Sequence, residues 1–281
     1  MNTSKIVFIT GATSGIGKIT ALFLARKGFV VYGTGRNPQE ENTAFTLLKM
    51  DVRDTESIRE AVQTVIAREG RIDILINNAG VGISGAIEEI PQNELHNLFA
   101  TNLYGVITLT QEVLPHMRKQ HNGLIINITS IAGYMGLPFR GMYSASKGAL
   151  MLASEALRME VKPFGIKVTT IAPGDYATDI ASRRYHAPVK EDSPYAEIYQ
   201  KSLDMMNQHV GSGGNPEEMA RKIYQIIQTK NPKVHYKQGN FLQKFSIVLK
   251  RILPGKMYEK MLMNHYDLTP APLQKKGELL K

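Results

Sequence analysis

The sequence predicts an α/β protein built on a doubly wound parallel sheet of about seven strands, with helices on both faces. Three observations predict it. Short apolar runs without polar alternation, the first at residues 6–9, are typical of strands buried on both faces. Segments with apolar residues at helical spacing separate these runs, and such alternation favours a parallel sheet. A glycine-rich turn at residues 11–17 joins the first strand to the first helix.

This turn is typical of a phosphate-binding loop. Gly11, Gly15 and Gly17 separate the strand from a helix expected over residues 16–27. Glycine lets phosphates approach the backbone at a helix N-terminus, where free N–H groups favour an anion. On the turn alone, a purely structural connection between strand and helix stays open.

A second strand at residues 29–34 completes a β-α-β unit and is followed by Gly35-Arg36. In dinucleotide folds an acidic residue at this point binds the ribose 2′-hydroxyl, whereas an Arg accommodates a 2′-phosphate. No carboxylate appears before Glu40. Arg36 therefore predicts NADP rather than NAD, and a solvated surface arginine is the alternative.

The remaining elements alternate in the same way. Strands are expected at residues 45–50, 72–76, 124–129, 166–171 and 233–236, and helices at residues 56–68, 93–119 and 143–162. Asn102 lies inside the second of these helices, although its amide competes for backbone hydrogen bonds. It is either a solvent-facing polar residue or a functional kink.

Tyr143 and Lys147, four residues apart, lie on one face of a helix. This spacing alone is a weak signal, and its position shortly after Ser130 gives it weight. Hydride transfer to a ketone builds negative charge on the oxygen, so the site must donate a proton and orient the carbonyl. A neighbouring ammonium favours the phenolate form of a tyrosine, and Lys147 can provide it.

The order of these motifs resembles the short-chain dehydrogenase/reductase family over about residues 5–180. The matching motifs are Thr10-Gly11-x-x-x-Gly15-Ile16-Gly17, Asp51, Asn77-Asn78-Ala79-Gly80, Asn102, Ser130, Tyr143-x-x-x-Lys147 and Pro173-Gly174-x-x-x-Thr178. The resemblance implies a Rossmann-like fold, and Gly35-Arg36 is similar to the NADP-preferring branch. Ser14 departs from the subset with Lys or Arg inside the glycine turn, so the NADP prediction rests mainly on Arg36.

The resemblance also implies catalytic roles. Tyr143 would donate the proton, Ser130 would hold the carbonyl oxygen, and Lys147 would also bind the nicotinamide ribose. Asn102 would hold a water that completes a proton relay through Lys147. NADPH supplies the hydride, so no metal is needed.

The implied cofactor contacts run from the glycine turn to the sixth strand. They are Gly11, Ser14, Gly15, Ile16, Gly17, Arg36, Asp51, Val52, Asn78, Ala79, Gly80, Tyr143, Lys147, Pro173, Gly174 and Thr178. Within this set Asp51 would contact the adenine edge and Thr178 the nicotinamide carboxamide.

Length and composition bound the protein class. The 281 residues, 43% of them hydrophobic, suit a single α/β domain over residues 1–281. The absence of cysteine fits a reducing compartment, and neither a signal peptide nor an apolar stretch of about 18 residues is found. We therefore expect a cytoplasmic protein. The net charge of +9 comes without a nucleic-acid-binding motif, so no nucleic-acid partner is expected.

Two segments fall outside the family motifs. Residues 180–215 follow the sixth strand and overhang the ligand crevice, so we interpret them as a substrate lid with hinge glycines at 211–214. An ordinary helical excursion is the alternative. Residues 240–281 form a basic, amphipathic C-terminal extension. It predicts peripheral contact with an anionic membrane, a seal over the substrate cleft, or a subunit contact in a homodimer or homotetramer.

The sequence as a whole predicts an NADPH-dependent oxidoreductase that acts on a large apolar ketone or secondary alcohol, such as a steroid or long-chain lipid. The apolar loop at residues 131–139 precedes Tyr143, and its Gly136-Leu137-Pro138-Phe139 is similar to steroid and retinoid reductases of the family. One alternative is a small polar or carboxylate-bearing ketone, bound by Arg140, Arg183 or Arg184. The other is a non-catalytic cofactor-binding regulatory protein, against which the intact catalytic residues argue.

Overall fold

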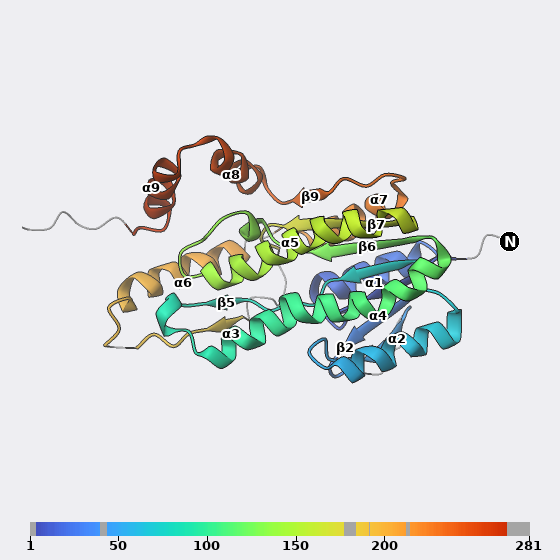
Figure 1. The fold of residues 1–281 in the computed structure, drawn as a ribbon. Helices are drawn as coiled ribbons and strands as arrows, with labels where there is room; N and C mark the ends of the chain where they lie inside the picture. Colours follow the sequence, from blue (N-terminus) through green and yellow to red (C-terminus); the bar gives the residue numbers. More distant parts are fainter. Residues whose placement is uncertain (1–3, 40–43, 177–183, 191, 212–213, 269–281) are drawn as a thin grey trace, which may run out of the picture.

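Seven parallel strands form the central sheet in the order β3-β2-β1-β4-β6-β7-β9 (Figure 1). The computed structural model describes residues 4–39, 44–176, 184–190, 192–211 and 214–268. The strands are β1 (Ile6–Ile9), β2 (Val30–Gly35), β3 (Thr46–Lys49), β4 (Ile74–Asn77), β6 (Gly123–Ile128), β7 (Ile166–Pro173) and β9 (His235–Gln238). The predicted Rossmann-like doubly wound sheet is confirmed.

Helices cover both faces of this sheet (Figure 1). Apolar side chains of α1 (Gly15–Arg26) and α7 (Pro216–Gln228) pack on one face. Those of α2 (Thr55–Glu69), α4 (Gly105–Gln120) and α5 (Gly141–Val161) pack on the other. Strands such as β4, in which every residue is buried, lie between two helical layers. This double burial is the reason that their sequences show no alternation.

The chain direction across the sheet reverses between β1 and β4. The first three strands extend to one side of β1, and the strands from β4 onward extend to the other. The loops that leave β1 and β4 therefore diverge at the carboxyl ends of the strands, where ligands bind in open α/β sheets.

The predicted long helix over residues 93–119 is present, but it contains a π-helical turn. The structure has α3 (Gln92–Phe99), a π-helical turn η2 (Ala100–Tyr104) and then α4. Asn102 occupies the wide turn and is fully buried, which excludes the solvent-facing alternative. From this turn, its side-chain amide bonds to the backbone of Val81 in the loop after β4.

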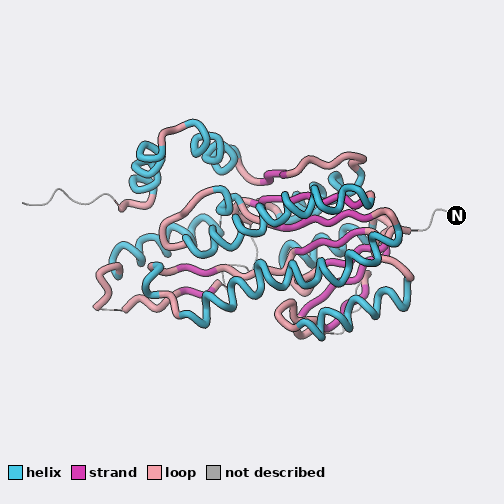
Figure 2. Tube along the Cα trace, in the orientation of Figure 1, coloured by secondary structure: helices cyan, strands magenta, loops and turns pink. Residues whose placement is uncertain are grey.

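Several short elements were not predicted. Strands β5 (Ile83–Ser84) and β8 (Tyr185–His186) pair outside the central sheet and appear as separate magenta segments in Figure 2. Two residues are too few to show a periodic pattern. The 3-10 turns η1 (Ile87–Glu89), η3 (Ile131–Tyr134) and η4 (Lys162–Phe164) link longer elements.

The segment after β7 contains α6 (Ala196–Gly211), which lies beyond the carboxyl ends of the strands (Figure 1). The C-terminal extension forms two helices, α8 (Phe241–Ile252) and α9 (Gly255–His265), with Pro254 as the N-cap of the second. Ile247 and Tyr258 anchor them on Ile131 and Met135 of the loop after β6. None of the helices in the described ranges has the length and hydrophobicity of a membrane span.

Candidate active site

A cavity of about 430 Å³ opens at the chain reversal between β1 and β4. It brings together most of the predicted cofactor residues. These are Gly11, Ser14, Gly15, Ile16, Gly17, Arg36, Asp51, Val52, Asn78, Ala79, Gly80, Tyr143, Lys147 and Pro173. Gly174 lines an adjoining cleft instead, and Thr178 lies outside the described residues.

The conformation of the turn requires glycine, because other residues would be strained or would clash there. Gly11 and Gly15 have φ values of 67° and 55°, which favour glycine. A Cβ on Gly17 would lie 2.2 Å from the carbonyl oxygen of Gly11. The side-chain amide of Asn78 donates hydrogen bonds to the carbonyls of Thr10 (2.8 Å) and Gly11 (3.3 Å). These bonds link the loops that leave β1 and β4.

The cavity fits an anionic dinucleotide. No acidic residue lies in the first turn of α1, so its N-terminal N–H groups can face phosphate. Arg36 lines the cavity, together with Arg53, which the sequence reasoning missed. Hydrogen bonds from Arg53, with the charges of Arg53 and Arg36, hold the pKa of Asp51 below its usual range, against the opposing effect of burial. Arg53 lies two residues after a predicted contact, which was the available signal.

Asn102 holds the loop after β4 in place. Its Oδ1 accepts from the N–H of Val81, and its Nδ2 donates to the carbonyl of Val81, both at 2.9 Å. The same Nδ2 donates to Ser146 Oγ at 3.1 Å. A Cβ on Gly80 would lie 3.2 Å from Lys147 Nζ and 3.3 Å from Asn102 Oδ1. Two predicted catalytic side chains therefore approach the same small backbone position.

Lys147 is buried in the wall of the cavity. Its Nζ donates to the carbonyl of Ile128 at 3.0 Å, and no carboxylate pairs with it among the described residues. Burial lowers the pKa of Lys147 to about 8. Its ammonium and neutral forms therefore both exist near neutral pH, which suits a group in a proton-transfer site.

This buried amine should make protein stability depend on pH. Lys147 titrates near 10.5 in the unfolded chain and near 8 in the folded protein, so between these values the unfolded state holds more protons. The free energy of unfolding should therefore rise with pH. Between about pH 7 and pH 9.5, the free energy of unfolding of wild type should rise by about 2 kcal/mol relative to that of Lys147→Met. Urea unfolding without cofactor would measure this difference. A constant difference between the two proteins would contradict the burial of a titrating amine.

Tyr143 and Ser130 lie where the cavity meets a second cleft. Tyr143 lines the first, Ser130 lines the second, and Pro173 lines both. Ser130 is buried, and its Oγ accepts from the N–H of Ala132 at 3.2 Å. The Arg140 guanidinium lies 5.5 Å from the ring centroid of Tyr143. The predicted proton donor and the predicted carbonyl ligand thus border one junction.

The second cleft, of about 660 Å³, has a largely apolar wall built by the C-terminal extension together with the loop after β6 and the end of β7. Its apolar residues are Ile131, Ala132, Met135, Leu137, Pro173, Tyr176, Leu242, Phe245, Leu249, Met261, Leu262 and Tyr266. The extension thus lines this second cleft. The amphipathic spacing of α8 was the sequence signal, but it could not identify what the helix covers.

Described residues of the segment after β7, among them Arg184 and Tyr199, also lie near the junction. Arg184 packs against Gly82, and its Nη1 donates to Met206 Sδ of α6 at 3.7 Å. Burial and the charge of Arg140 lower the pKa of Arg184. Tyr199 of α6 is buried and donates to the carbonyl of Ser84 at 2.9 Å. Arg183 and part of the predicted glycine hinge lie outside the described residues.

Comparisons with known proteins agree with this geometry. A family model described as short chain dehydrogenase matches residues 5–188. The chain belongs to the short-chain dehydrogenase/reductase family. It is accordingly an oxidoreductase acting on CH–OH and C=O groups, and the predicted enzyme class is confirmed.

Individual relatives cover nearly the whole chain. A protein named 3-ketodihydrosphingosine reductase from Bacteroides thetaiotaomicron is 41% identical over 94% of this chain and 98% of its own length. The uncharacterized oxidoreductase YusZ of Bacillus subtilis is 35% identical over 92% of this chain and 97% of its own. The crystal structure of a short-chain dehydrogenase from Streptomyces avermitilis has a TM-score of 0.80 and 29% identity, covering 95% of this chain and 97% of that one.

The described part of the chain contains no group of three or more His, Cys, Asp or Glu side chains that could hold a metal ion.

One solved relative, ElxO with NADP bound, is 26% identical with a TM-score of 0.70. The match covers 85% of this chain and 99% of that one.

Proposed function

We propose that this chain reduces the ketone of a long-chain lipid, with NADPH as hydride donor. The observation that carries this proposal is the cleft of about 660 Å³, which begins at Ser130 and continues along apolar side chains of α8 and α9. An alkyl chain would lie along this wall, because apolar clefts with few polar groups bind apolar ligands. The ketone would then lie at the junction with the dinucleotide cavity.

The Bacteroides relative supports a lipid ketone, since its name specifies 3-ketodihydrosphingosine, a long-chain 2-amino ketone. The cleft also contains two carboxylates, Asp175 and Glu218, that suit an ammonium group. Asp175 Oδ2 accepts from the Gln243 amide at 2.8 Å. A steroid, which the sequence also allowed, would use the apolar wall but not these carboxylates.

Four side chains of this protein would take part in the reaction. Tyr143 donates the proton to the ketone oxygen, and Ser130 Oγ orients that oxygen by a hydrogen bond. Lys147 supplies positive charge beside the phenol, and Asn102 fixes the loop at Val81 that borders the site. NADPH supplies the hydride when it is bound. The segment over residues 180–215 serves as the lid of this single domain.

Arg36 is proposed to select NADP by bonding its 2′-phosphate. A charge-assisted hydrogen bond of roughly 1.5–3 kcal/mol corresponds to about 10- to 150-fold in affinity. Arg36→Ala should therefore weaken NADPH binding by that factor and leave NADH binding little changed, measured by titration of the nicotinamide fluorescence. Arg53→Ala is the matched variant, because Arg53 is already bonded to Asp51 and should affect both cofactors alike. An equal loss for both cofactors in Arg36→Ala would refute the assignment.

The substrate proposal is tested by comparing kcat/KM for 3-ketodihydrosphingosine, a steroid ketone and a small polar ketone, each with NADPH. A preference of at least about 100-fold for the long-chain ketone over the small one is expected, since several methylenes lose contact with water. Leu249→Trp should narrow the cleft and reduce only the long-chain activity. A preference for the small ketone would refute the proposal.

One alternative substrate has a specific observation in its favour. Arg140 and Arg184 both lie near Tyr143, and two such guanidiniums can bind a carboxylate. A keto acid of the same chain length is therefore the informative competitor. If it is preferred over the amino ketone, and Arg184→Gln removes that preference, the substrate is an anionic lipid ketone.

The chain is also proposed to form an oligomer. A homodimer or homotetramer is expected from the family resemblance, and light scattering coupled to gel filtration of the full chain would measure it.

A further inference from the structure

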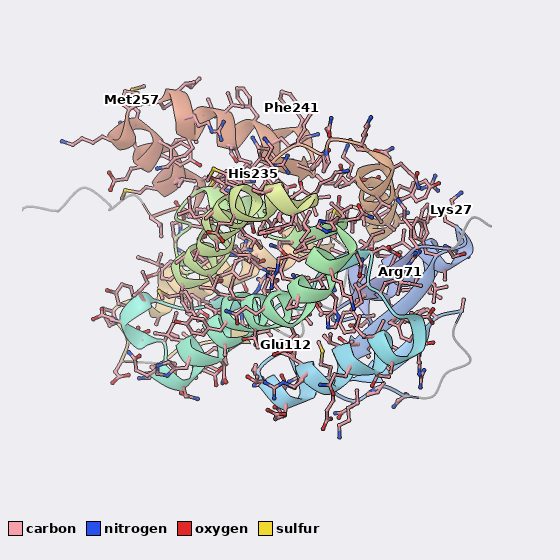
Figure 3. All side chains as sticks on the ribbon, turned by 45° about the vertical axis from the view of Figure 1, so that its right-hand side comes forward. Lys27, Arg71, Glu112, His235, Phe241 and Met257 are labelled. Atoms are coloured by element: carbon pink, nitrogen blue, oxygen red, sulfur yellow. The ribbon has the colours of Figure 1, made fainter. Side chains whose placement is uncertain are left out.

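The outer side of α8 and α9 exposes a row of large apolar side chains. Phe241, Phe245, Val248 and Ile252 recur at spacings of four, three and four residues, so they form one stripe along α8. Met257 of α9 extends the exposed set, and Figure 3 shows Phe241 and Met257 on the outer side of the extension, away from the sheet. The rings of Phe241 and Phe245 stack at 5.6 Å. Contiguous exposed apolar side chains of this kind mark an interaction surface.

Basic side chains accompany the stripe. Residues 241–265 contain five Lys or Arg residues and one acidic residue, Glu259. Lys244 and Arg251 lie along one flank of the α8 stripe, because each falls three residues after a member of it. Both are exposed, and neither forms an ion pair within the described part of the chain. A stripe of Phe, Val and Ile with Lys and Arg beside it is complementary to an anionic lipid surface.

We propose that the outer face of α8 and α9 docks on an anionic phospholipid bilayer. Phe241, Phe245 and Ile252 would enter the boundary between headgroups and acyl chains, while Lys244 and Arg251 contact lipid phosphates. A bilayer fits better than a protein partner, because the two charged side chains that flank the α8 stripe, Lys244 and Arg251, are both basic.

Docking would place the mouth of the substrate cleft at the lipid surface. Leu242 and Phe245 are both exposed on α8 and both line the cleft that begins at Ser130. The same helix therefore joins the docking surface to the site of the chemistry. This second step rests on the proposed function, since it assumes a lipid ketone that partitions into the membrane.

The docking step is tested with the full chain and sedimented vesicles, without substrate or cofactor. Wild type is expected to bind vesicles of phosphatidylglycerol and phosphatidylcholine and to bind pure phosphatidylcholine at least about 10-fold more weakly, with a loss at high salt. Lys244→Gln/Arg251→Gln should weaken binding to the anionic vesicles roughly 10-fold or more. Phe241→Gln/Ile252→Gln should do so as well, because it removes the apolar anchors.

Matched controls keep the test specific. Leu152 and Met159 on α5 are 68% and 70% exposed, close to the 73% of Phe241 and 67% of Ile252. Leu152→Gln/Met159→Gln should leave binding unchanged, as should Lys119→Gln/Lys230→Gln, which removes the same charge far from the extension. Absence of wild-type binding to anionic vesicles would overturn the proposal. So would equal binding by all variants, or a change of oligomeric state in Phe241→Gln/Ile252→Gln without any loss of vesicle binding.

The second step is tested with a long-chain ketone carried in vesicles and a short-chain, water-soluble ketone. Phe241 and Ile252 do not line the cleft, so Phe241→Gln/Ile252→Gln should lower kcat/KM at least about 10-fold for the vesicle-borne ketone only. Equal loss with both ketones would overturn delivery through this face. If wild type binds vesicles but reduces no long-chain ketone, the proposed function fails and the docking surface stands.

Discussion

Replacing Tyr143 with Phe is expected to lower kcat by roughly 10²- to 10⁴-fold while the affinity for NADPH changes little. The substitution removes only the phenolic hydroxyl, which is the proposed proton donor, from a side chain that lines the dinucleotide cavity. The ring stays, so its contact with the Arg140 guanidinium and its place in the cavity wall are kept. Steady-state kinetics with a reducible ketone and a separate NADPH titration measure the two effects.

Tyr185→Phe is the matched control, because Tyr185 lines the same cavity and packs in the same apolar cluster as Tyr143. Its kcat should stay within about threefold of wild type, since a hydroxyl outside the reaction is not needed for proton transfer. A Tyr143→Phe variant that keeps more than a tenth of the wild-type kcat would show that another group donates the proton.

Gly17→Ala should damage both stability and cofactor binding. Its Cβ would lie 2.2 Å from the Gly11 carbonyl and 2.5 Å from Asn78 Nδ2, so backbone must move. Overpacking of this kind costs about 1–3 kcal/mol, and the shifted turn would also displace the N–H groups that are expected to bind the phosphates. We expect a loss of about 2 kcal/mol in the free energy of unfolding and at least about 10-fold in NADPH affinity.

Gly255→Ala provides the comparison, because nothing lies within 4 Å of a Cβ at that position at the start of α9. It should change the free energy of unfolding by less than about 1 kcal/mol and leave NADPH affinity at the wild-type value. The chain has no Trp, so unfolding is followed by circular dichroism and binding by the fluorescence of NADPH. Wild-type affinity in Gly17→Ala would show that phosphates bind elsewhere.

Local sequence was sufficient for most of the fold. Strands such as β1 and β4 are buried on both faces, so their apolar runs were visible without any partner. The alternation of these strands with helices then indicated a parallel sheet. Within the predicted helix at residues 93–119, the sequence did not indicate the π-helical turn, from which Asn102 bonds to Val81.

The candidate site was predicted to a similar extent. Motifs that fall at the carboxyl ends of parallel strands converge on one edge of the sheet, so Gly11, Asn78 and Pro173 could be placed together from spacing. Arg53 was missed because a single exposed arginine after Asp51 shows no pattern. The burial of Lys147, and with it the lowered pKa, could not be foreseen, since desolvation depends on what packs around the amine.

The sequence by itself determined the Rossmann-like sheet and the position of the glycine turn, because these depend on local spacing. Only the tertiary structure decided that α8 and α9 form the wall of a cleft. That wall depends on contacts between residues far apart in the chain, such as the Tyr258 hydroxyl and Met135 Sδ at 2.8 Å, 123 positions apart. The apolar period of α8 indicated a helix with one buried face, but a period carries no information about the surface that buries it.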